Sequence, residues 1–287
     1  MNGERIHILG AGVMGSGLAQ WLAALGRRVT LIDVDDDILA RARARIRELT
    51  RFARFLGGQA AADPAALLER IDFRSAISGL SDAAWLLENV TEDRAVKERA
   101  YREADRACPA ECIFISNTSA IPITELGAMT GRADRVIGVH FMNPVALIRT
   151  VELVPGRETS LETIARAREF LSSIDKQPVA VRDAPGFVSN RLLMGMVNEA
   201  ARLVAEGVAT PREIDRICRE CFGHRMGPLE TADLIGLDTI RRTLDVLRKH
   251  FPGDRYATSS ALAAAEARGD LGRKSGRGFH DYGTGAS

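Results

Sequence analysis

The sequence lacks the features that would place the protein in a membrane, on nucleic acid or outside the cell. Across 287 residues the formal net charge is only +1, so no basic excess points to nucleic acid or to an anionic membrane. No apolar run approaches the roughly 18 residues that a membrane-spanning helix needs. The first apolar segment begins near residue 5, too early for a signal peptide, so we expect a cytoplasmic protein.

Cysteine is also scarce. The four cysteines fall in two pairs, Cys108 with Cys112 and Cys218 with Cys221, and the second pair has the C-x-x-C spacing of many zinc and redox sites. However, the second pair lies within a helical pattern and Cys112 opens an apolar, strand-like run. Free cysteine behaves as a small hydrophobic residue in such places, so we expect buried, reduced thiols and no bound metal.

A glycine-rich turn stands at the start of the chain, between a strand-like run and an apolar helical pattern. The run Ile6–Leu9 leads into Gly10, Gly12 and Gly15. The first glycine permits a sharp turn, the second lets the backbone approach a pyrophosphate, and the third lets the helix pack on the strand. The N-terminus of the helix then offers N–H groups and a positive dipole end to the phosphates. The expected cofactor-binding residues of this turn are Gly10, Gly12, Val13, Met14 and Gly15.

An acidic residue follows at the expected distance. The apolar run Val29–Ile32 ends in Asp33, 18 residues after Gly15. A carboxylate at the tip of the second strand accepts hydrogen bonds from ribose hydroxyls and repels a 2′-phosphate, which favours NAD over NADP as the cofactor. The alternative is a glycine-rich turn in an α/β domain that binds no nucleotide, because the motif alone is a weak signal.

Further strand-like runs alternate with helical stretches. This alternation predicts an α/β fold with a doubly wound, mostly parallel Rossmann sheet. Polar residues follow directly after four of the runs: Asp33, Glu88, Ser116 and His140. Ligands of such sheets bind outside the carboxyl ends of the strands, so these residues predict a catalytic cleft.

The pattern changes near Asp183 and becomes mainly helical, over about 187–207, 211–221, 229–250 and 257–268. We therefore expect an NAD-binding Rossmann domain over 1–183 and a smaller, all-helical C-terminal domain over 184–287 for substrate binding and dimerisation. The apolar pattern from Phe187 to Val208 is broad enough for burial in an oligomer interface as well as in a core.

A histidine and a glutamate have the spacing of an acid–base pair. Glu152 lies 12 residues after His140, in the next strand-like run, and two strands joined by a loop can bring such side chains together. A carboxylate on one imidazole nitrogen fixes the tautomer and leaves the other nitrogen as a general base. From spacing alone, a structural histidine is an equally good interpretation.

Several segments together resemble the 3-hydroxyacyl-CoA dehydrogenase family over nearly the whole chain. They are the glycine turn with Asp33 and the segments Ser116–Ser119, His140–Val145, Val151–Glu152, Asp183–Arg191 and Gly227–Glu230. The resemblance implies that His140 takes the proton of the substrate 3-hydroxyl while a hydride passes to NAD, and that Glu152 orients His140.

The same resemblance implies roles for residues elsewhere in the chain. Ser116 would hydrogen-bond the substrate oxygen, and Asn190, from the helical domain, would close the site. Glu88 and Asn143 would line the nicotinamide ribose side, and Lys274 would reach the cofactor region. A dimer through the helical domain is also implied.

The chain departs from the family where CoA would bind. Two positions on the helix after the second strand, a serine and a lysine in CoA-using members, are Leu49 and Leu56 here. Arg51 and Arg54 stand nearby as candidate substrate-binding cations, although an arginine run on a helix is usually a solvated face. Other segments resemble a branch of polyketide pathways that oxidises glyceryl groups on acyl-carrier protein: Ser119–Ile123, Thr150–Glu152 and Cys221–Asp233. We expect a carrier-protein thioester, with a CoA thioester of fatty-acid metabolism as the alternative.

Two other functions stay open at this point. A non-catalytic, crystallin-like NAD-binding protein would keep the fold, but it would be expected to have lost at least one of His140, Glu152, Ser116 and Asn190. A dehydrogenase for a small free hydroxy acid would need a cationic clamp for the carboxylate, for which Arg149 is the one candidate we identify.

Overall fold

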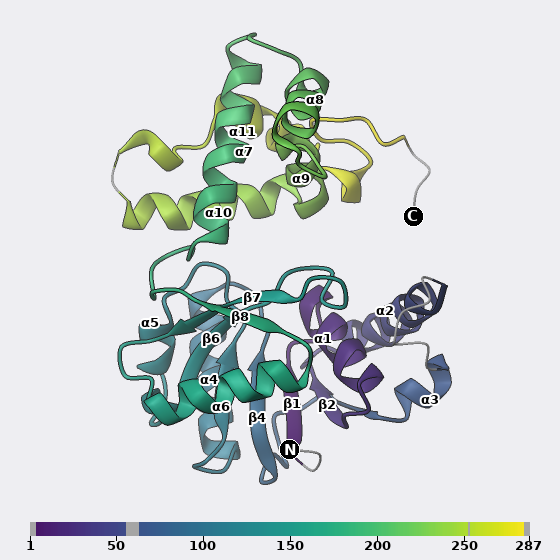
Figure 1. Ribbon diagram of the computed structural model, residues 1–287, viewed down its shortest axis with the longest axis vertical. Helices are drawn as coiled ribbons and strands as arrows, with labels where there is room; N and C mark the ends of the chain where they lie inside the picture. The colour runs from purple at the N-terminus through teal and green to yellow at the C-terminus, as the bar shows by residue number, and fades with distance from the viewer. Residues whose placement is uncertain (1–3, 56–62, 252, 284–287) are drawn as a thin grey trace. The chain divides into compact units, whose positions relative to one another are not determined.

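The computed structural model describes residues 4–55, 63–251 and 253–283 (Figure 1). The chain divides into two compact units, Met1–Ala184 and Pro185–Ser287. We call the first the sheet unit and the second the helical unit. None of the described helices is long and apolar enough to cross a membrane.

One eight-stranded sheet forms the centre of the sheet unit, with the order β3-β2-β1-β4-β5-β6-β7-β8. Its strands are β1 (Arg5–Leu9), β2 (Val29–Ile32), β3 (Ile71–Arg74), β4 (Ala83–Glu88), β5 (Ile113–Ser116), β6 (Val136–His140), β7 (Thr150–Pro155) and β8 (Gln177–Ala180). All neighbouring strands are parallel except β6 and β7, which are antiparallel. The predicted mostly parallel sheet is confirmed, and the strand order reverses beside β1, where such folds bind ligands.

Helices cover both faces of this sheet. They are α1 (Val13–Ala24), α2 (Asp36–Phe55), α3 (Pro64–Leu68), α4 (Arg94–Ala107), α5 (Ile123–Gly127), the 3-10 turn η1 (Ala133–Arg135) and α6 (Leu161–Ser173). Side chains of α1, α2 and α6 share one core cluster with Ile113 and Ile115 of β5. Phe114 alternates to the other face, where the ring of Tyr101 from α4 lies 6.1 Å away. The sheet is therefore doubly wound.

The helical unit has its own core. Its elements are α7 (Ser189–Ala205), α8 (Pro211–Phe222), α9 (Pro228–Ile235), α10 (Leu237–His250), the 3-10 turns η2 (Asp254–Tyr256) and η3 (Arg273–Ser275), and α11 (Ser260–Ala267). Apolar residues of α7, α9, α10 and α11 meet in a cluster around the buried Tyr256. Two buried carboxylates fix the C-terminal segment: Asp215 contacts the His280 ring at 2.6 Å, and Asp233 accepts the N–H groups of Phe279 and His280.

Two sequence expectations about local structure were wrong, and one strand was missed. The single helix expected over 229–250 is two helices, because Gly236 between them has a φ of 103°, outside the helical region. Strand β3 was not predicted, since only Ile71 and Phe73 mark it as apolar. Cys108, Cys112 and Cys218 are buried as expected, but Cys221 near the end of α8 is exposed.

Candidate active site

The glycine turn forms a cradle at the carboxyl edge of the sheet. Gly10 has a φ of 93°, and a Cβ there would lie 2.6 Å from the carbonyl carbon of Asn89. A Cβ on Gly15 would lie 1.8 Å from the carbonyl oxygen of Gly10, so only glycine lets α1 pack this closely. A Cβ on Gly12 would meet nothing within 4 Å. Gly12 is also the N-cap of α1 and provides no side-chain cap, which leaves space for a pyrophosphate at the positive end of the helix.

Asp33 lies at the edge of a cavity that begins at this cradle. The cavity measures about 550 Å³, and its lining includes Gly10, Gly12, Asp33, Ile38, Asn89 and Val90. The Asp33 carboxylate is oriented by the N–H of Ala11 at 2.8 Å and by that of Asp35 at 3.3 Å. Each of these contacts uses a different oxygen, so both oxygens keep lone pairs for ribose hydroxyls. An apolar cavity ending in a fixed carboxylate fits the adenosine half of NAD.

The structure brings His140 and Glu152 together. The last residue of β6 is His140, and the antiparallel register places Glu152 of β7 directly opposite. Glu152 Oε2 lies 2.8 Å from His140 Nδ1, and both residues are buried. The antiparallel pairing explains the contact, since opposite residues of such strands carry their side chains on the same face.

Two asparagines that the sequence analysis did not single out tie the strand ends together. Asn117 Nδ2 donates to Asn89 Oδ1 at 2.8 Å, and Asn117 Oδ1 accepts the N–H of Phe141 at 2.9 Å. This chain of contacts links the ends of β4, β5 and β6 next to His140. Both asparagines directly follow a strand, so the rule that found Glu88 and Ser116 could have found them.

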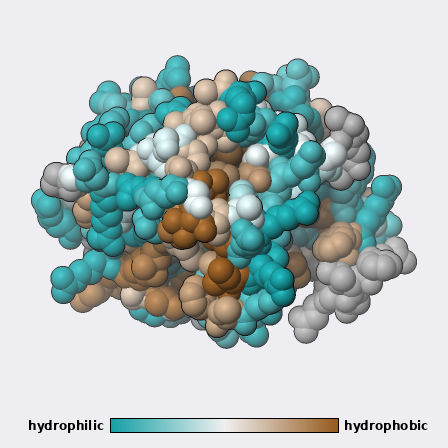
Figure 2. All heavy atoms as spheres, turned by 90° about the horizontal axis from the view of Figure 1, so that it is seen from above, coloured by the Kyte–Doolittle hydropathy of each residue, from teal (hydrophilic) through white to brown (hydrophobic). Residues whose placement is uncertain are grey.

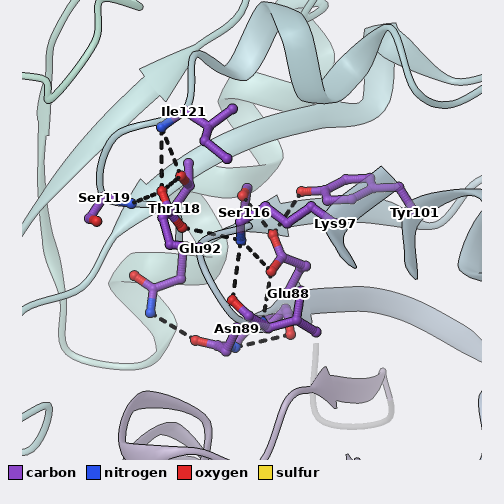
Figure 3. Close-up of polar contacts among 12 residues, drawn as sticks. Glu88, Asn89, Glu92, Lys97, Tyr101, Ser116, Thr118, Ser119 and Ile121 are labelled. Atoms are coloured by element: carbon purple, nitrogen blue, oxygen red, sulfur yellow. Dashed lines mark hydrogen bonds and ion pairs between the residues drawn. The ribbon is translucent and has the colours of Figure 1, made fainter. Parts of the chain in front are cut away.

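A buried network surrounds Glu88 (Figure 3). One carboxylate oxygen accepts from Lys97 Nζ at 2.6 Å and from the N–H of Val90 at 2.8 Å. The other accepts from the Ser116 hydroxyl at 2.9 Å and the Tyr101 hydroxyl at 3.2 Å. Both oxygens are therefore engaged inside the protein, and the Glu88 residue is only 1% exposed. The expected contact between Glu88 and the nicotinamide ribose stays a prediction.

Electrostatics hold this network together. Burial opposes the charge on Lys97, but the carboxylates of Glu88 and Glu92 outweigh it and raise the pKa of Lys97. Burial, with the nearby Glu88 charge, raises the pKa of the Tyr101 hydroxyl well above its usual range. Glu92 lies 3.4 Å from Lys97 and accepts from the Thr118 hydroxyl, so the same lysine also supports the loop after β5.

The other predicted cofactor and substrate residues occupy more exposed positions. Val13 is exposed at the start of α1, whereas Met14 is partly buried against the core. Asn143 is exposed in the loop after β6 and forms a cis peptide bond with Pro144. In the helical unit, Lys274 pairs with Asp238.

The remaining candidates can be located only in part. Asn190 lies in the first turn of α7. Arg51 is exposed on α2. Arg54 belongs to the same helix, but its side chain lies outside the described residues, and so does Leu56. Arg149, the alternative carboxylate clamp, is engaged by Asp175.

The glycine turn at the start of α1, the carboxylate of Asp33 and the imidazole of His140 paired with Glu152 are the features that an NAD-dependent oxidoreductase acting on a CH–OH group requires. Comparisons with known proteins agree. Residues 5–184 match the family model of the 3-hydroxyacyl-CoA dehydrogenase NAD binding domain, and residues 186–282 match the model of the C-terminal domain of the same enzymes. The chain belongs to the 3-hydroxyacyl-CoA dehydrogenase family.

Individual relatives match over nearly the full length. A probable 3-hydroxybutyryl-CoA dehydrogenase of Bacillus subtilis is 40% identical over 97% of each chain. The mitochondrial hydroxyacyl-coenzyme A dehydrogenase of Sus scrofa is 35% identical over 97% of this chain and 91% of its own length. Among solved structures, the (S)-3-hydroxybutyryl-CoA dehydrogenase PaaH1 of Ralstonia eutropha has a TM-score of 0.89 at 37% identity, covering 98% of this chain and 99% of its own.

Proposed function

We propose that this enzyme oxidises the 3-hydroxyl group of an acyl thioester, with His140 as the general base and Glu152 as its partner. The observation that carries the proposal is the 2.8 Å contact between His140 Nδ1 and Glu152 Oε2 at the carboxyl edge of the sheet. A carboxylate at Nδ1 keeps the proton on that nitrogen and directs the basic lone pair of Nε2 toward a substrate. It also stabilises the imidazolium that forms when Nε2 takes a proton.

In the proposed reaction the 3-hydroxyl group is oxidised to a carbonyl by the loss of one hydride and one proton. NAD, when bound, accepts the hydride that leaves C3 of the substrate. The hydroxyl proton passes to Nε2 of His140, and the C3–O bond becomes a carbonyl. Ser116 would contact the reacting oxygen, with its hydroxyl oriented by Glu88 at 2.9 Å. Asn190 and Lys274 keep the substrate and cofactor roles that the family resemblance implies.

The carrier of the acyl group is a separate part of the proposal. Leu49 stands where CoA-using members carry a serine, and the segments shared with the polyketide branch favour acyl-carrier protein. Arg51 and Arg54 would then offer charge to the carrier. The names of the relatives favour a CoA thioester, which is the second candidate.

We also propose a homodimer formed through the helical unit. This unit exposes large apolar side chains on α7 and α8: Leu192, Ile217 and Phe222. Figure 2 shows hydrophobic residues gathered in patches on one face of the molecule. Exposed apolar patches of this kind often mark protein interfaces. The cytoplasmic location expected from the sequence stays a prediction.

The test of the proposed function is the rate of NADH formation with two substrates, 3-hydroxybutyryl-CoA and glyceryl-loaded acyl-carrier protein. Turnover of the carrier-bound substrate supports the first candidate, and turnover of the CoA ester alone supports the second and rejects the first. No turnover of either thioester, with normal turnover of a free hydroxy acid, would overturn the proposal.

A further inference from the structure

A polar cavity lies at the amino edge of the sheet, the opposite edge from the one where β6 ends in His140. It measures about 280 Å³, and its lining comes mainly from the first residues of β1, β2 and β3 and the residues just before them. The glycine turn and Asp33 follow the other ends of β1 and β2 and line a different cavity. Neither the proposed reaction nor the binding of NAD uses the cavity at the amino edge.

Three arginines stand at the amino ends of neighbouring strands. Arg5 begins β1, Arg28 directly precedes β2 and Arg70 directly precedes β3. Because parallel strands begin at the same edge of a sheet, all three residues line this cavity. Arg74, the last residue of β3, also belongs to the lining.

Two of these four guanidinium groups are engaged by carboxylates of the lining. Asp82 lies 3.3 Å from Arg5, and Asp72 lies 2.7 Å from Arg74. Each pair leaves no net charge, so neither pair by itself selects the charge of a ligand.

The other two, Arg28 and Arg70, form no ion pair within the part of the chain that the structure describes. Arg70 Nη1 donates to the carbonyl oxygen of Ala23 at 3.0 Å, and the exposed Glu69 is the remaining carboxylate of the described lining. Two cations therefore stand against one carboxylate. This excess of positive charge in a cavity favours an anionic ligand.

His7 distinguishes this cavity from an ordinary charged surface. Since Ile6 and Ile8 face the core cluster, His7 lies on the opposite face of β1, beside Thr30 of β2, and it is only 1% exposed. Its Nε2 lies 3.2 Å from Asp82 Oδ1, whereas its Nδ1 has no hydrogen-bond partner among the described residues. Most buried polar atoms of proteins have such a partner, so a ligand of this cavity is a candidate for it.

The contact with Asp82 determines which kind of partner Nδ1 needs. A carboxylate only accepts hydrogen bonds, so the Nε2 atom of His7 carries the ring proton. Burial lowers the pKa of the imidazole, so at pH 7 the Nδ1 atom keeps its lone pair and needs a donor. The matching ligand combines negative charge for the arginines with an O–H group for Nδ1.

We propose that this cavity binds a phosphate group, with Arg28 and Arg70 on its charged oxygens and His7 Nδ1 accepting a hydrogen bond from a hydroxyl of the ligand. The planar guanidinium of arginine matches the geometry of phosphate oxygens. A water molecule occupies about 30 Å³ of the liquid, so the cavity has room for a phosphate group with a short organic part. The ligand is therefore free phosphate or a small phosphate monoester. This site goes beyond the proposed function and does not depend on the identity of the thioester.

The test is isothermal titration calorimetry of the enzyme saturated with NAD, so that the phosphates of the cofactor occupy the glycine cradle. Inorganic phosphate and sulfate are titrated separately at pH 7 and constant ionic strength. Sulfate carries two charges but no O–H group, so the wild type should bind phosphate about tenfold more tightly than sulfate. Glycerol 3-phosphate is titrated in the same way. Tighter binding than that of phosphate assigns a monoester as the ligand, and weaker binding assigns free phosphate.

Three variants separate the contributions. Arg28→Gln should weaken phosphate binding about tenfold, because one charge-assisted hydrogen bond is lost. Arg27→Gln is the matched control, since Arg27 is outside this lining and donates to the Ser173 hydroxyl at 3.2 Å, and its Kd for phosphate should not change. His7→Leu should lose the preference for phosphate over sulfate. The rate of NADH formation should stay the same in Arg28→Gln and Arg27→Gln.

A wild type that binds no phosphate while NAD is bound, or that binds phosphate and sulfate equally, would overturn the proposal. Equal weakening in Arg28→Gln and Arg27→Gln would show a general effect of charge and would overturn it as well. If His7→Leu does not fold, the comparison of the two anions on the wild type decides the role of His7. The titrations contain no thioester, so they stand or fall separately from the proposed function.

Discussion

Two acid–base pairs lie at the carboxyl edge of the same sheet, and they differ in what surrounds them. His140 and Glu152 face each other across an antiparallel strand pair, 2.8 Å apart. Lys97 and Glu88 are 2.6 Å apart, with side chains only 1% exposed and further hydrogen bonds around the carboxylate. An imidazole can exchange a proton near neutral pH, whereas a buried ammonium between carboxylates keeps its proton. The His140–Glu152 pair is therefore suited to proton transfer, whereas the Lys97–Glu88 pair is suited to holding Ser116 in place.

The largest expected effect comes from His140→Gln. Removing the general base should lower kcat by roughly 10²- to 10⁴-fold, the usual contribution of acid–base catalysis. NADH binding, measured by fluorescence titration, should persist because the glycine cradle is untouched. His250→Gln, at an exposed position on α10, is the control. Near-normal turnover of His140→Gln would remove His140 from its proposed role.

Changes to the second pair, Lys97 and Glu88, should lower the free energy of unfolding. Glu88→Gln leaves a buried ammonium with a weaker partner, and breaking such a pair costs about 3–5 kcal/mol of unfolding free energy. Urea denaturation of the wild type and the variant measures this loss. The double variant Glu88→Gln with Lys97→Met should recover part of it, because the buried charge is gone. A single variant as stable as the wild type would contradict the structural role.

Two buried lysines, Lys97 and Lys176, have different surroundings and should differ in how they affect the pH dependence of stability. Lys97 lies between carboxylates, whereas Lys176 contacts backbone carbonyls, and burial lowers the pKa of Lys176 to about 8, from 10.5. Between these two values the unfolded chain binds more protons than the folded one, so this group makes stability rise with pH. The slope should be at most about 1.4 kcal/mol per pH unit. Urea denaturation between the two pKa values should show this rise in the wild type relative to Lys176→Met; parallel curves would contradict it.

The smallest effect should come from Tyr101→Phe. This change removes one hydroxyl, 3.2 Å from Glu88, and leaves the aromatic packing against Phe114 in place. The expected loss is about 1 kcal/mol in unfolding free energy, with little change in kcat. Thermal and urea denaturation measure the first and steady-state kinetics the second. A fall in kcat of tenfold or more would show that the network around Glu88 contributes to the chemistry as well as to stability.

The features that could be predicted from the sequence are those that depend on residues close together in the chain. The glycine turn and the strand that is followed by Asp33 are local patterns, and the structure has both of them. The contact of His140 with Glu152 could be suggested from spacing, but only the antiparallel register of β6 and β7 explains it.

Features that depend on distant partners could not be predicted. The surroundings of Glu88 come from α4 and β5, since Lys97, Tyr101 and Ser116 all reach it. That Gln20 Nε2 has no hydrogen-bond partner among the described residues likewise becomes visible only once α1, α2 and the loop after β6 enclose a cavity. The break at Gly236 was missed because the apolar pattern continues on both sides of it.

The most direct test of the central claim is a crystal structure of the enzyme with NAD and a 3-hydroxyacyl thioester analogue. Our account predicts the substrate 3-oxygen within about 2.6–3.2 Å of His140 Nε2, the reach that a general base requires. It also predicts that Glu152 stays on Nδ1. A complex in which the 3-oxygen contacts a different ionisable side chain, with His140 directed away from it, would contradict the assignment of His140 as the base.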